Sequence, residues 1–325
     1  MIAFTALHAL DGALAKTASF GWDDADWTIE PYSAGSLYDA TEVTVRDIRE
    51  FSAVLTELER LPNSAIVRGA LKPGIANRNI RRLMHDKADV AATFEPQPRR
   101  WVMLDIDGRV AANPLLTDQE RLAQIVCDLP EFFHDVSFHY QWSSKAGICG
   151  WDELSVHLFY ALDEPWLDDM LRQRAADEDW GVDLAVFNAV QVHYTAAPVF
   201  KNCADPLAGR RSGFVAGKRD VVTMSTWTRP VRAPRPAYLP RLNAIDTFRE
   251  KLTHIGPSFH VPIIAAILTL VDVTNNNFDD DFCISEVMTA VDAAPGGRKY
   301  IDERYLKRVI NGARKKYQDE QEITK

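Results

Sequence analysis

Two aspartates one residue apart close an apolar run, a pattern typical of a divalent-metal site. Residues 101–108 read Trp-Val-Met-Leu-Asp-Ile-Asp-Gly, which predicts a buried strand that ends in a glycine turn. Because side chains alternate along a strand, Asp105 and Asp107 should share one face. Two carboxylates this close repel each other unless a cation lies between them, and Mg²⁺ or Mn²⁺ takes such oxygen ligands. The alternative is a solvated Asp-x-Asp-Gly turn without a metal.

A second pair at the same spacing supplies groups that can hold phosphate. Ser155 and His157 lie two residues apart in a predicted strand, so the hydroxyl and the imidazole should also share a face. The loop ahead of this strand contributes small hydroxyls, one cation and a glycine, which suit a phosphate-binding loop. The candidate phosphate-binding residues of this loop are Ser143, Ser144 and Lys145. For His157 the alternative is a structural histidine that binds no ligand.

A third carboxylate, Asp183, follows in the segment Gly-Val-Asp-Leu. Together with Asp105 and Asp107 it would complete a three-carboxylate site that holds two ions. In such a site one ion activates an attacking hydroxyl, while both stabilise charge on the phosphate under attack. The alternative is that Asp183 caps a helix beginning at Leu184.

These motifs need elements that bring them together, and the surrounding sequence alternates between helical and extended patterns. Thr117 and Glu120 match a capping box that opens a helix. The patterns predict helices at 43–61, 117–127 and 166–176, and strands at 65–69, 101–108, 136–142 and 154–162. We therefore predict an α/β or α+β core with a mixed sheet, between about residues 60 and 225.

A length of 325 residues is enough for two domains. Four prolines in 228–241 prevent regular helix and favour an extended connector. Beyond it, amphipathic patterns predict a small helical bundle with helices at 245–252, 262–271, 284–293 and 303–317. The predicted organisation is a catalytic domain over 1–227, a Pro/Arg-rich linker over 228–241 and a helical bundle domain over 242–325.

The net charge of −9 excludes a protein that coats nucleic acid through overall positive charge, so any such contact needs local basic patches. Cations in such patches track a phosphate backbone, and binding through them weakens steeply with salt. The candidate nucleic-acid-binding residues are Arg78, Arg81, Arg210, Arg211, Lys218, Arg219 and Arg308. The alternative is an ordinary charged surface.

Targeting and metal-binding signals of other kinds are absent from the sequence. Its start lacks the basic and apolar regions of a signal peptide, and the longest apolar run is too short to cross a bilayer. We therefore expect a cytoplasmic protein without a membrane partner. The four cysteines and eight histidines are scattered, with no spacing typical of a zinc site.

The order of the motifs resembles that of a known family. Leu-Asp-Ile-Asp-Gly at 104–108, the Ser-Ser-Lys-Ala-Gly loop, Ser-Val-His at 155–157 and Val-Asp at 182–183 look like the three motifs of the archaeo-eukaryotic primase superfamily. More closely, they resemble the primase-polymerases of phages and plasmids, over about residues 60–220. In that family the first and third motifs supply acidic metal ligands, and the Ser-x-His motif contacts the triphosphate of the incoming nucleotide.

The resemblance implies a template-dependent nucleotidyl transferase, a DNA primase or polymerase that makes or extends primers. Asp105, Asp107 and Asp183 would be the catalytic ligands of two Mg²⁺ or Mn²⁺ ions, while Ser155 and His157 would bind the nucleotide together with the loop at 143–145. The implied partners are single-stranded DNA template and nucleoside triphosphates, with a replicative helicase as a further candidate. The compartment would be a bacterial host cell if the chain is phage- or plasmid-encoded.

One family feature is missing. Many relatives carry an Arg-x-Pro-Gly segment after the third motif, whose arginine helps to bind the triphosphate. Here residues 191–198 read Gln-Val-His-Tyr-Thr-Ala-Ala-Pro, without that arginine. The candidate substitutes are Lys145, Lys201, Arg210 and Arg211.

Two other functions fit parts of the sequence. A phosphohydrolase of the haloacid-dehalogenase type also opens with Asp-x-Asp-Gly after an apolar strand, and it would use Asp105 as a nucleophile. Against it, Arg109 stands where that motif normally has Thr or Val, no Gly-Asp-x-x-x-Asp segment follows, and Ser155 and His157 have no role. A catalytically silent nucleic-acid-binding replication module would need only the basic segments.

Overall fold

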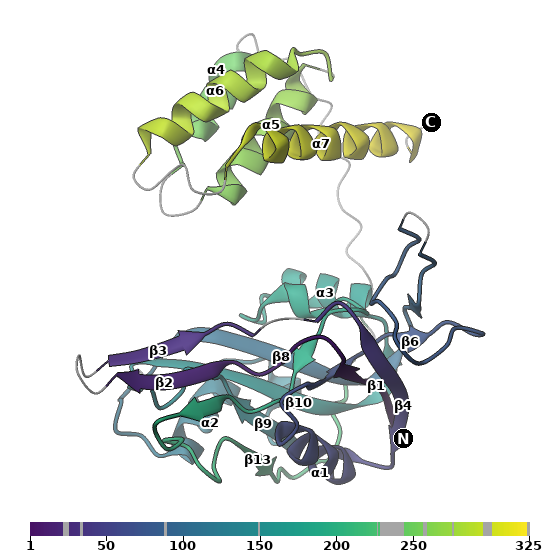
Figure 1. Cartoon of the computed structure of the whole chain (residues 1–325), viewed down its shortest axis with the longest axis vertical. Coiled ribbons are helices and arrows are strands. Elements are labelled where there is room, and N and C mark those ends of the chain that lie inside the picture. Colours follow the sequence, from purple (N-terminus) through teal and green to yellow (C-terminus); the bar gives the residue numbers. More distant parts are fainter. Residues whose placement is uncertain are drawn as a thin grey trace. The chain divides into compact units, whose positions relative to one another are not determined.

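The computed structural model describes residues 1–21, 26–32, 35–87, 90–148, 150–225, 227, 244–255, 259–274, 276–294 and 301–323. The chain divides into two compact units, Met1–Pro230 and Val231–Lys325. Its fold class is α+β, as predicted (Figure 1). The predicted linker, 228–241, lies outside the described residues.

Two antiparallel four-stranded sheets make up most of the first unit. The central sheet has the order β13-β9-β10-β8, with strands Ser212–Val215, Phe138–Trp142, Glu153–Trp166 and Arg99–Val110. The second sheet has the order β11-β5-β1-β4, with strands His193–Tyr194, Ser64–Val67, Ile2–Ala9 and Tyr38–Val45. The two strands that carry the predicted motifs, β8 and β10, therefore pair directly with each other.

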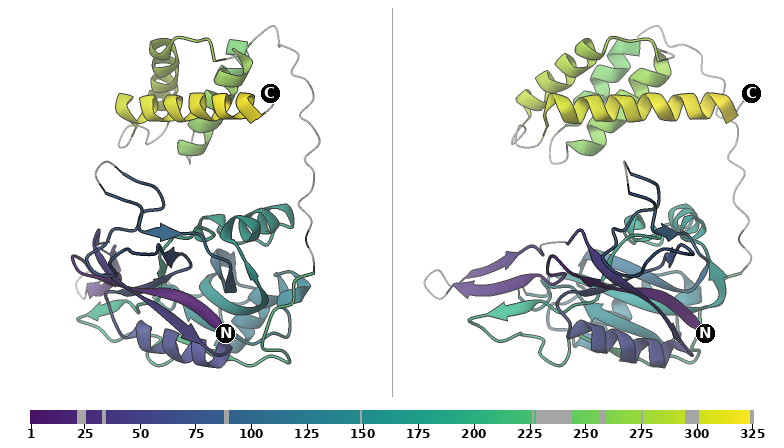
Figure 2. Two further views of the ribbon diagram at one scale, coloured as in Figure 1. Left: turned by 90° about the vertical axis from the view of Figure 1, so that its right-hand side faces the viewer. Right: turned by 45° about the vertical axis from the view of Figure 1, so that its right-hand side comes forward.

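Smaller elements complete the first unit. The β2–β3 hairpin projects from one end, as the turned views in Figure 2 also show. Parallel pairing of β12 with β2 makes this small sheet a mixed one. Its strands are β2 Thr17–Gly21, β3 Asp26–Glu30 and β12 Val199–Lys201, and a separate ribbon pairs β6 Ala70–Leu71 with β7 Phe94–Glu95. The helices are α1 Ile48–Glu59, α2 Asp118–Cys127 and α3 Asp168–Asp177, with 3₁₀ turns at Glu131–Phe133 and Leu184–Val186.

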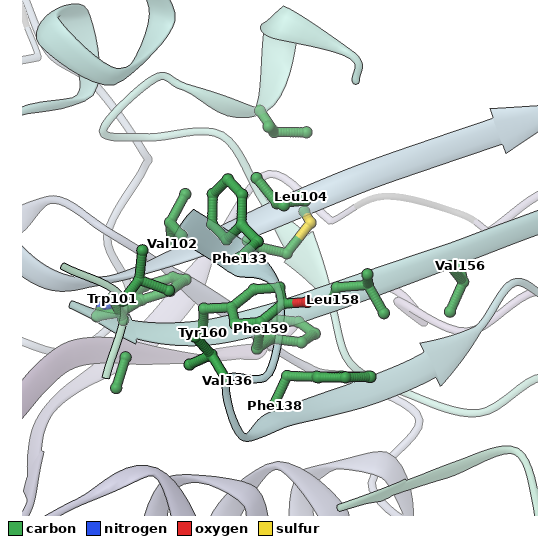
Figure 3. Packing of buried hydrophobic residues seen from close by; sticks show 14 of the residues in the cluster. Trp101, Val102, Leu104, Phe133, Val136, Phe138, Val156, Leu158, Phe159 and Tyr160 are labelled. Carbon is green, nitrogen blue, oxygen red and sulfur yellow. The ribbon is translucent and has the colours of Figure 1, made fainter. Parts of the chain in front are cut away.

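Alternation of side chains along β8 separates a core face from a site face. Leu104 is buried in the main hydrophobic core, where side chains of β8 and β10 gather around Phe133 (Figure 3). On the opposite face Trp101 is also buried, and its indole N–H donates to a carbonyl of β1 at 3.0 Å. The same alternation leaves Asp105 and Asp107 on the face of Trp101.

A buried ion pair connects the second sheet to α3. Arg68 directly follows β5 and is fully buried, and its Nε donates to Asp168 Oδ1 at 2.6 Å. A second guanidinium nitrogen, Nη2, donates to the carbonyl of Trp166 at 2.7 Å. Burial raises the pKa of Asp168, and the charge of Arg68 opposes that rise. Removing either partner would leave an uncompensated charge inside the unit, which is costly.

The predicted helix at 43–61 begins five residues late because a cap fixes its start. The carboxylate of Asp47 accepts hydrogen bonds from the N–H groups of Arg49 (3.0 Å) and Glu50 (2.9 Å). An aspartate N-cap satisfies the free N–H groups of a first turn, so the helix starts at Ile48. Residues 43–45 belong to strand β4 instead. By contrast, the predicted capping box of α2 is confirmed, with Thr117 and Glu120 bonded reciprocally.

The predicted glycine turn after Asp107 is wrong, because β8 continues to Val110. Gly108 takes a positive φ of 65°, which a glycine adopts without steric cost. The pairing of β8 with β10 shifts register at this point, and Val110 still pairs with Glu153. The strand therefore passes its glycine through a bulge instead of ending there. The predicted helix at 166–176 likewise begins later, at Asp168, because β10 runs through residue 166.

The second unit is a helical bundle with its own core. Its helices are α4 Ala244–Leu252, α5 His260–Val273, α6 Asp280–Ala293 and α7 Glu303–Ile323, which confirms the four predicted helices with extended ends. Phe248, Ile263, Val287 and Ile310 are fully buried in this core. Across the described residues, every helix is too short or too polar to span a bilayer.

Two buried histidines should make the first unit sensitive to acid. His139 on β9 bonds to Ser52 through Nδ1 at 2.9 Å, and burial lowers its pKa to about 3. Burial also lowers the pKa of His193 to about 3. The ordinary histidine pKa is about 6.5. Below that pH the unfolded chain binds protons that the folded unit does not bind, so the free energy of unfolding decreases as the pH decreases. Each histidine should contribute a slope of up to about 1.4 kcal/mol per pH unit between about pH 6.5 and 3.

We predict that His139→Gln flattens this dependence, because glutamine can bond to Ser52 and does not titrate. The measurement is urea unfolding between pH 7 and pH 4.5 (about one scan per half unit), followed by tryptophan fluorescence. All eight tryptophans lie in the first unit, so the signal reports on it alone. The matched control is His85→Gln at an exposed position, which should leave the slope unchanged. Equal slopes for wild type and His139→Gln would contradict the prediction.

Candidate functional site

A cavity of about 270 Å³ brings most of the predicted site residues together. Its walls include seven of the eight residues predicted to bind metal or nucleotide: Asp105, Asp107, Ser143, Ser144, Ser155, His157 and Asp183. They come from β8, the loop after β9, β10 and the turn before Leu184. Segments that are far apart in the sequence thus converge on one concave site.

The register of β8 and β10 sets the geometry of four of these residues. Asp105 and His157 are direct partners across the ladder, and His157 Nε2 lies 3.5 Å from Asp105 Oδ1. At the bulge, the Ser155 hydroxyl donates to the carboxylate of Asp107 and accepts the N–H of Gly108 at 3.0 Å. Both pairs therefore share the face that their two-residue spacing predicts.

Asp183 caps a turn and also lines the cavity beside the other two acids. Its carboxylate caps the 3₁₀ turn Leu184–Val186 by accepting the N–H of Ala185 at 2.9 Å. Its own backbone N–H donates to the carbonyl of Asp105 at 2.9 Å, which fixes the turn beside β8. The cap orients the third carboxylate, and the backbone bond brings it to the other two.

The electrostatics of the cavity are unfavourable for a charged Asp105. Burial raises the pKa of Asp105, and the charges of Asp183 and Asp107 raise it further, whereas His157 and then Lys16 lower it. A carboxylate crowded by other acids in this way attracts cations, and carboxylate oxygens suit hard divalent ions.

The side chains of the cavity do not by themselves form a complete metal-binding site. Within the part of the chain that the structure describes, no group of three or more His, Cys, Asp or Glu residues is arranged to hold a metal ion. The two-ion site on Asp105, Asp107 and Asp183 therefore stays a prediction. What favours it is the donor set, which consists of oxygen ligands whose repulsion a cation would relieve.

The loop after β9 contributes its serines and not its lysine. The backbone N–H of Ser143 donates to the carbonyl of Ser155 at 3.0 Å. The Ser143 hydroxyl is buried and has no hydrogen-bond partner among the described residues. A buried hydroxyl without a partner is costly unless a ligand or water completes it. Ser144 also lines the cavity, but Lys145 is exposed and lies outside its walls. The predicted role of Lys145 therefore has no support in the geometry.

The structure corrects one predicted nucleic-acid contact. Arg211 is only 3% exposed, its Nε donates to Asp205 Oδ2 at 2.9 Å, and its Nη1 donates to the carbonyl of Ser143 at 2.9 Å. A guanidinium committed to these buried contacts is not available to a phosphate backbone. Arg211 instead supports the loop that carries Ser143.

The other predicted basic residues lie outside the walls of the cavity. Arg78, Arg210 and Lys218 pair with Asp39, Asp118 and Asp135 respectively. Arg219 donates to the carbonyl of His134 at 2.9 Å. Arg81 and Arg308 are exposed, the latter in the second unit. Their contacts with nucleic acid stay predictions.

Sequence reasoning missed two residues of the site, Lys16 and Tyr32. Both line the cavity, although they precede the first acidic motif by more than 70 residues. They reach it because β12 pairs with β2, which places the base of the β2–β3 hairpin beside residues 191–198. No local sequence pattern predicts that Lys16 and Tyr32 line the cavity, because the pairing of β12 with β2 joins distant segments.

Comparison with known proteins adds no assignment. No protein-family model matches the chain, and no curated protein or solved structure is significantly similar to it. The resemblance to primase-polymerases therefore stays a prediction that depends on the motifs and on their convergence.

We predict that Mn²⁺ stabilises the wild-type first unit and not Asp105→Asn. A ligand that binds only the folded state stabilises it by about 2.7 kcal/mol at 100 times its dissociation constant. Without metal, Asp105→Asn should be more stable than wild type, because it removes a buried charge that two acids repel. Thermal unfolding with and without Mn²⁺, followed by tryptophan fluorescence, measures both effects.

The matched control is Asp152→Asn, which changes an exposed carboxylate outside the cavity walls and should keep the full response to Mn²⁺. An equal response in Asp105→Asn, or no response in wild type, would rule out metal binding at this site.

Proposed function

We propose that the first unit is a template-dependent nucleotidyl transferase of the primase-polymerase kind, which makes or extends primers on single-stranded DNA. The observation that carries the proposal is the convergence of Asp105, Asp107 and Asp183 with Ser155 and His157 on one cavity. A two-ion phosphoryl-transfer site requires this combination of carboxylates and phosphate-binding groups.

The chemistry is an in-line displacement on a nucleotide. The oxygen of a 3′ hydroxyl forms a bond to the α-phosphorus, the bond to the departing pyrophosphate breaks, and the hydroxyl proton passes to solvent. When Mg²⁺ or Mn²⁺ is bound, it makes the hydroxyl easier to deprotonate and neutralises the charge that develops on the phosphate. Asp105, Asp107 and Asp183 would hold these ions through their oxygens.

The residues around the acids would orient them and the triphosphate. Ser155 fixes the carboxylate of Asp107 through its hydroxyl and is itself held by the N–H of Gly108. His157 stands beside Asp105, where an N–H can donate to a phosphate oxygen. The Ser143 hydroxyl, which has no hydrogen-bond partner among the described residues, is a further donor that a bound phosphate would satisfy.

The partners of the protein follow from this proposal. They are single-stranded DNA template and nucleoside triphosphates, with a replicative helicase as a further candidate, in a bacterial host cell if a phage or plasmid encodes the chain. Exposed cations such as Arg81 and Arg219 are candidates for the template path, because they lie outside the cavity and on the surface.

The deciding experiment supplies labelled nucleoside triphosphates and single-stranded DNA, with and without a primer, in Mg²⁺ or Mn²⁺. Wild type should form labelled oligomers. Asp105→Ala and Asp107→Ala should each lose at least about 100-fold of this activity, as expected for groups that stabilise transition-state charge. Both variants should still bind the template, and the control Asp152→Ala should keep full activity.

Two outcomes would contradict the proposal. Release of phosphate from small phosphoesters without oligomers would indicate the phosphohydrolase of the haloacid-dehalogenase type. Template binding without synthesis, unchanged in Asp105→Ala, would indicate a catalytically silent replication module.

A further inference from the structure

Lys16 places a positive charge inside an otherwise acidic site. Among the described residues that line the cavity, it is the only lysine or arginine. It is half-buried, and no carboxylate of the described chain lies within 4.0 Å of its amino group in an ion pair. Its charge is nevertheless felt by Asp105, whose pKa it lowers. Lys16 therefore lies close enough to act on the charge of Asp105 without forming an ion pair with it.

The fold holds the backbone of Lys16 from both sides. Leu14 and Ala15 before it are buried, and the N–H of Leu14 donates to the carbonyl of Pro62 at 2.8 Å. On the other side the carbonyl of Lys16 accepts the N–H of Val199 at 2.8 Å. Lys16 thus has a fixed origin at the base of the hairpin.

Two tyrosines limit where its side chain can go. The amino nitrogen of Lys16 lies 5.9 Å from the ring centre of Tyr32, within the range of a cation–π contact. Tyr32 in turn packs on Tyr194, with ring centres 4.2 Å apart and an angle of 31° between the planes. All three side chains line the cavity. The aromatic pair therefore keeps the ammonium group at the wall of the site.

A fixed cation in this position needs an anion. If the three aspartates hold divalent ions, those ions repel Lys16 at short range, because like charges in a half-buried site are poorly screened. An anion between Lys16 and the ions removes that repulsion. The phosphate tail of a nucleotide whose α-phosphate lies at the ions has the right charge and extends away from them.

The other candidates for this role are already engaged or lie elsewhere. Lys201 lies outside the cavity walls, 3.8 Å from Glu30. Arg210 pairs with Asp118, and Arg211 is buried against Asp205. Lys145 is exposed outside the walls.

We propose that Lys16 binds the β- or γ-phosphate of the incoming nucleoside triphosphate, and so takes the place of the arginine that the segment 191–198 lacks. This inference rests on the proposed function. Tyr32 acts on it as a positioning residue, since it supports the ammonium group without reaching the phosphate.

The test compares binding of dATP and dAMP in Mg²⁺, by isothermal titration without template. Lys16→Met keeps the aliphatic stem and removes the charge. It should weaken dATP binding about 10- to 100-fold, the value of a charge-assisted hydrogen bond, and change dAMP binding by less than about twofold. Lys16→Arg should restore most of the affinity for dATP. In the synthesis assay Lys16→Met should raise KM for nucleotide more than it lowers kcat.

The matched control is Lys201→Met, a lysine in the same small sheet that should leave both affinities unchanged. Equal weakening of dATP and dAMP by Lys16→Met, or no weakening of either, would overturn the inference. The thermal midpoint of each variant shows whether the unit still folds.

The failures of the two proposals are distinguishable. If wild type binds dATP and synthesises oligomers while Lys16→Met does the same equally well, only the role of Lys16 is wrong. If dATP binding depends on Lys16 but wild type makes no oligomer on any template, Lys16 binds triphosphate and the polymerase assignment is wrong. If wild type binds no dATP, both are wrong.

Discussion

The antiparallel register of β8 and β10 is the constraint on which the candidate site depends. It sets Asp105 opposite His157, and the bulge at Gly108 lets Ser155 reach both Asp107 and the backbone. Because side chains alternate with a period of two, a slip of one residue would turn these polar groups into the core and expose the apolar ones. The large apolar side chains on the core face oppose such a slip. Core packing and site geometry are therefore two consequences of one pairing.

The pairing of β8 with β10 also places the carboxylate of Asp105 where its negative charge is unfavourable. Burial and two neighbouring carboxylates raise the pKa of Asp105, so the site costs stability in the absence of a cation. Elsewhere in the unit the buried charges are paired, as in Arg68 with Asp168. Several acids crowded into one cavity of a stable scaffold are characteristic of sites that bind or transform a ligand. The crowding of three acids in one cavity supports the proposed function.

Residues near the N-terminus of the chain complete the lining of the cavity. The base of the β2–β3 hairpin brings Lys16 and Tyr32 against the segment that follows Asp183, and β12 ties the two together. The acids and the cation then line one cavity, a combination that fits a ligand with a negatively charged tail and a metal-bound end. Arg211, by contrast, is not available to a ligand, because its guanidinium pairs with Asp205 and donates to the carbonyl of Ser143.

Local patterns in the sequence determined which residues share a face and where several helices begin. The spacing of Asp105 with Asp107 and of Ser155 with His157 predicted their common side, and Thr117 with Glu120 predicted the cap of α2, because these features depend only on neighbours in the chain. Only the tertiary structure decided that Lys16 joins the site, that Arg211 is buried and that β8 continues past Gly108. Each of these depends on pairing or burial between segments far apart in sequence, and a residue's own neighbours carry no record of such contacts.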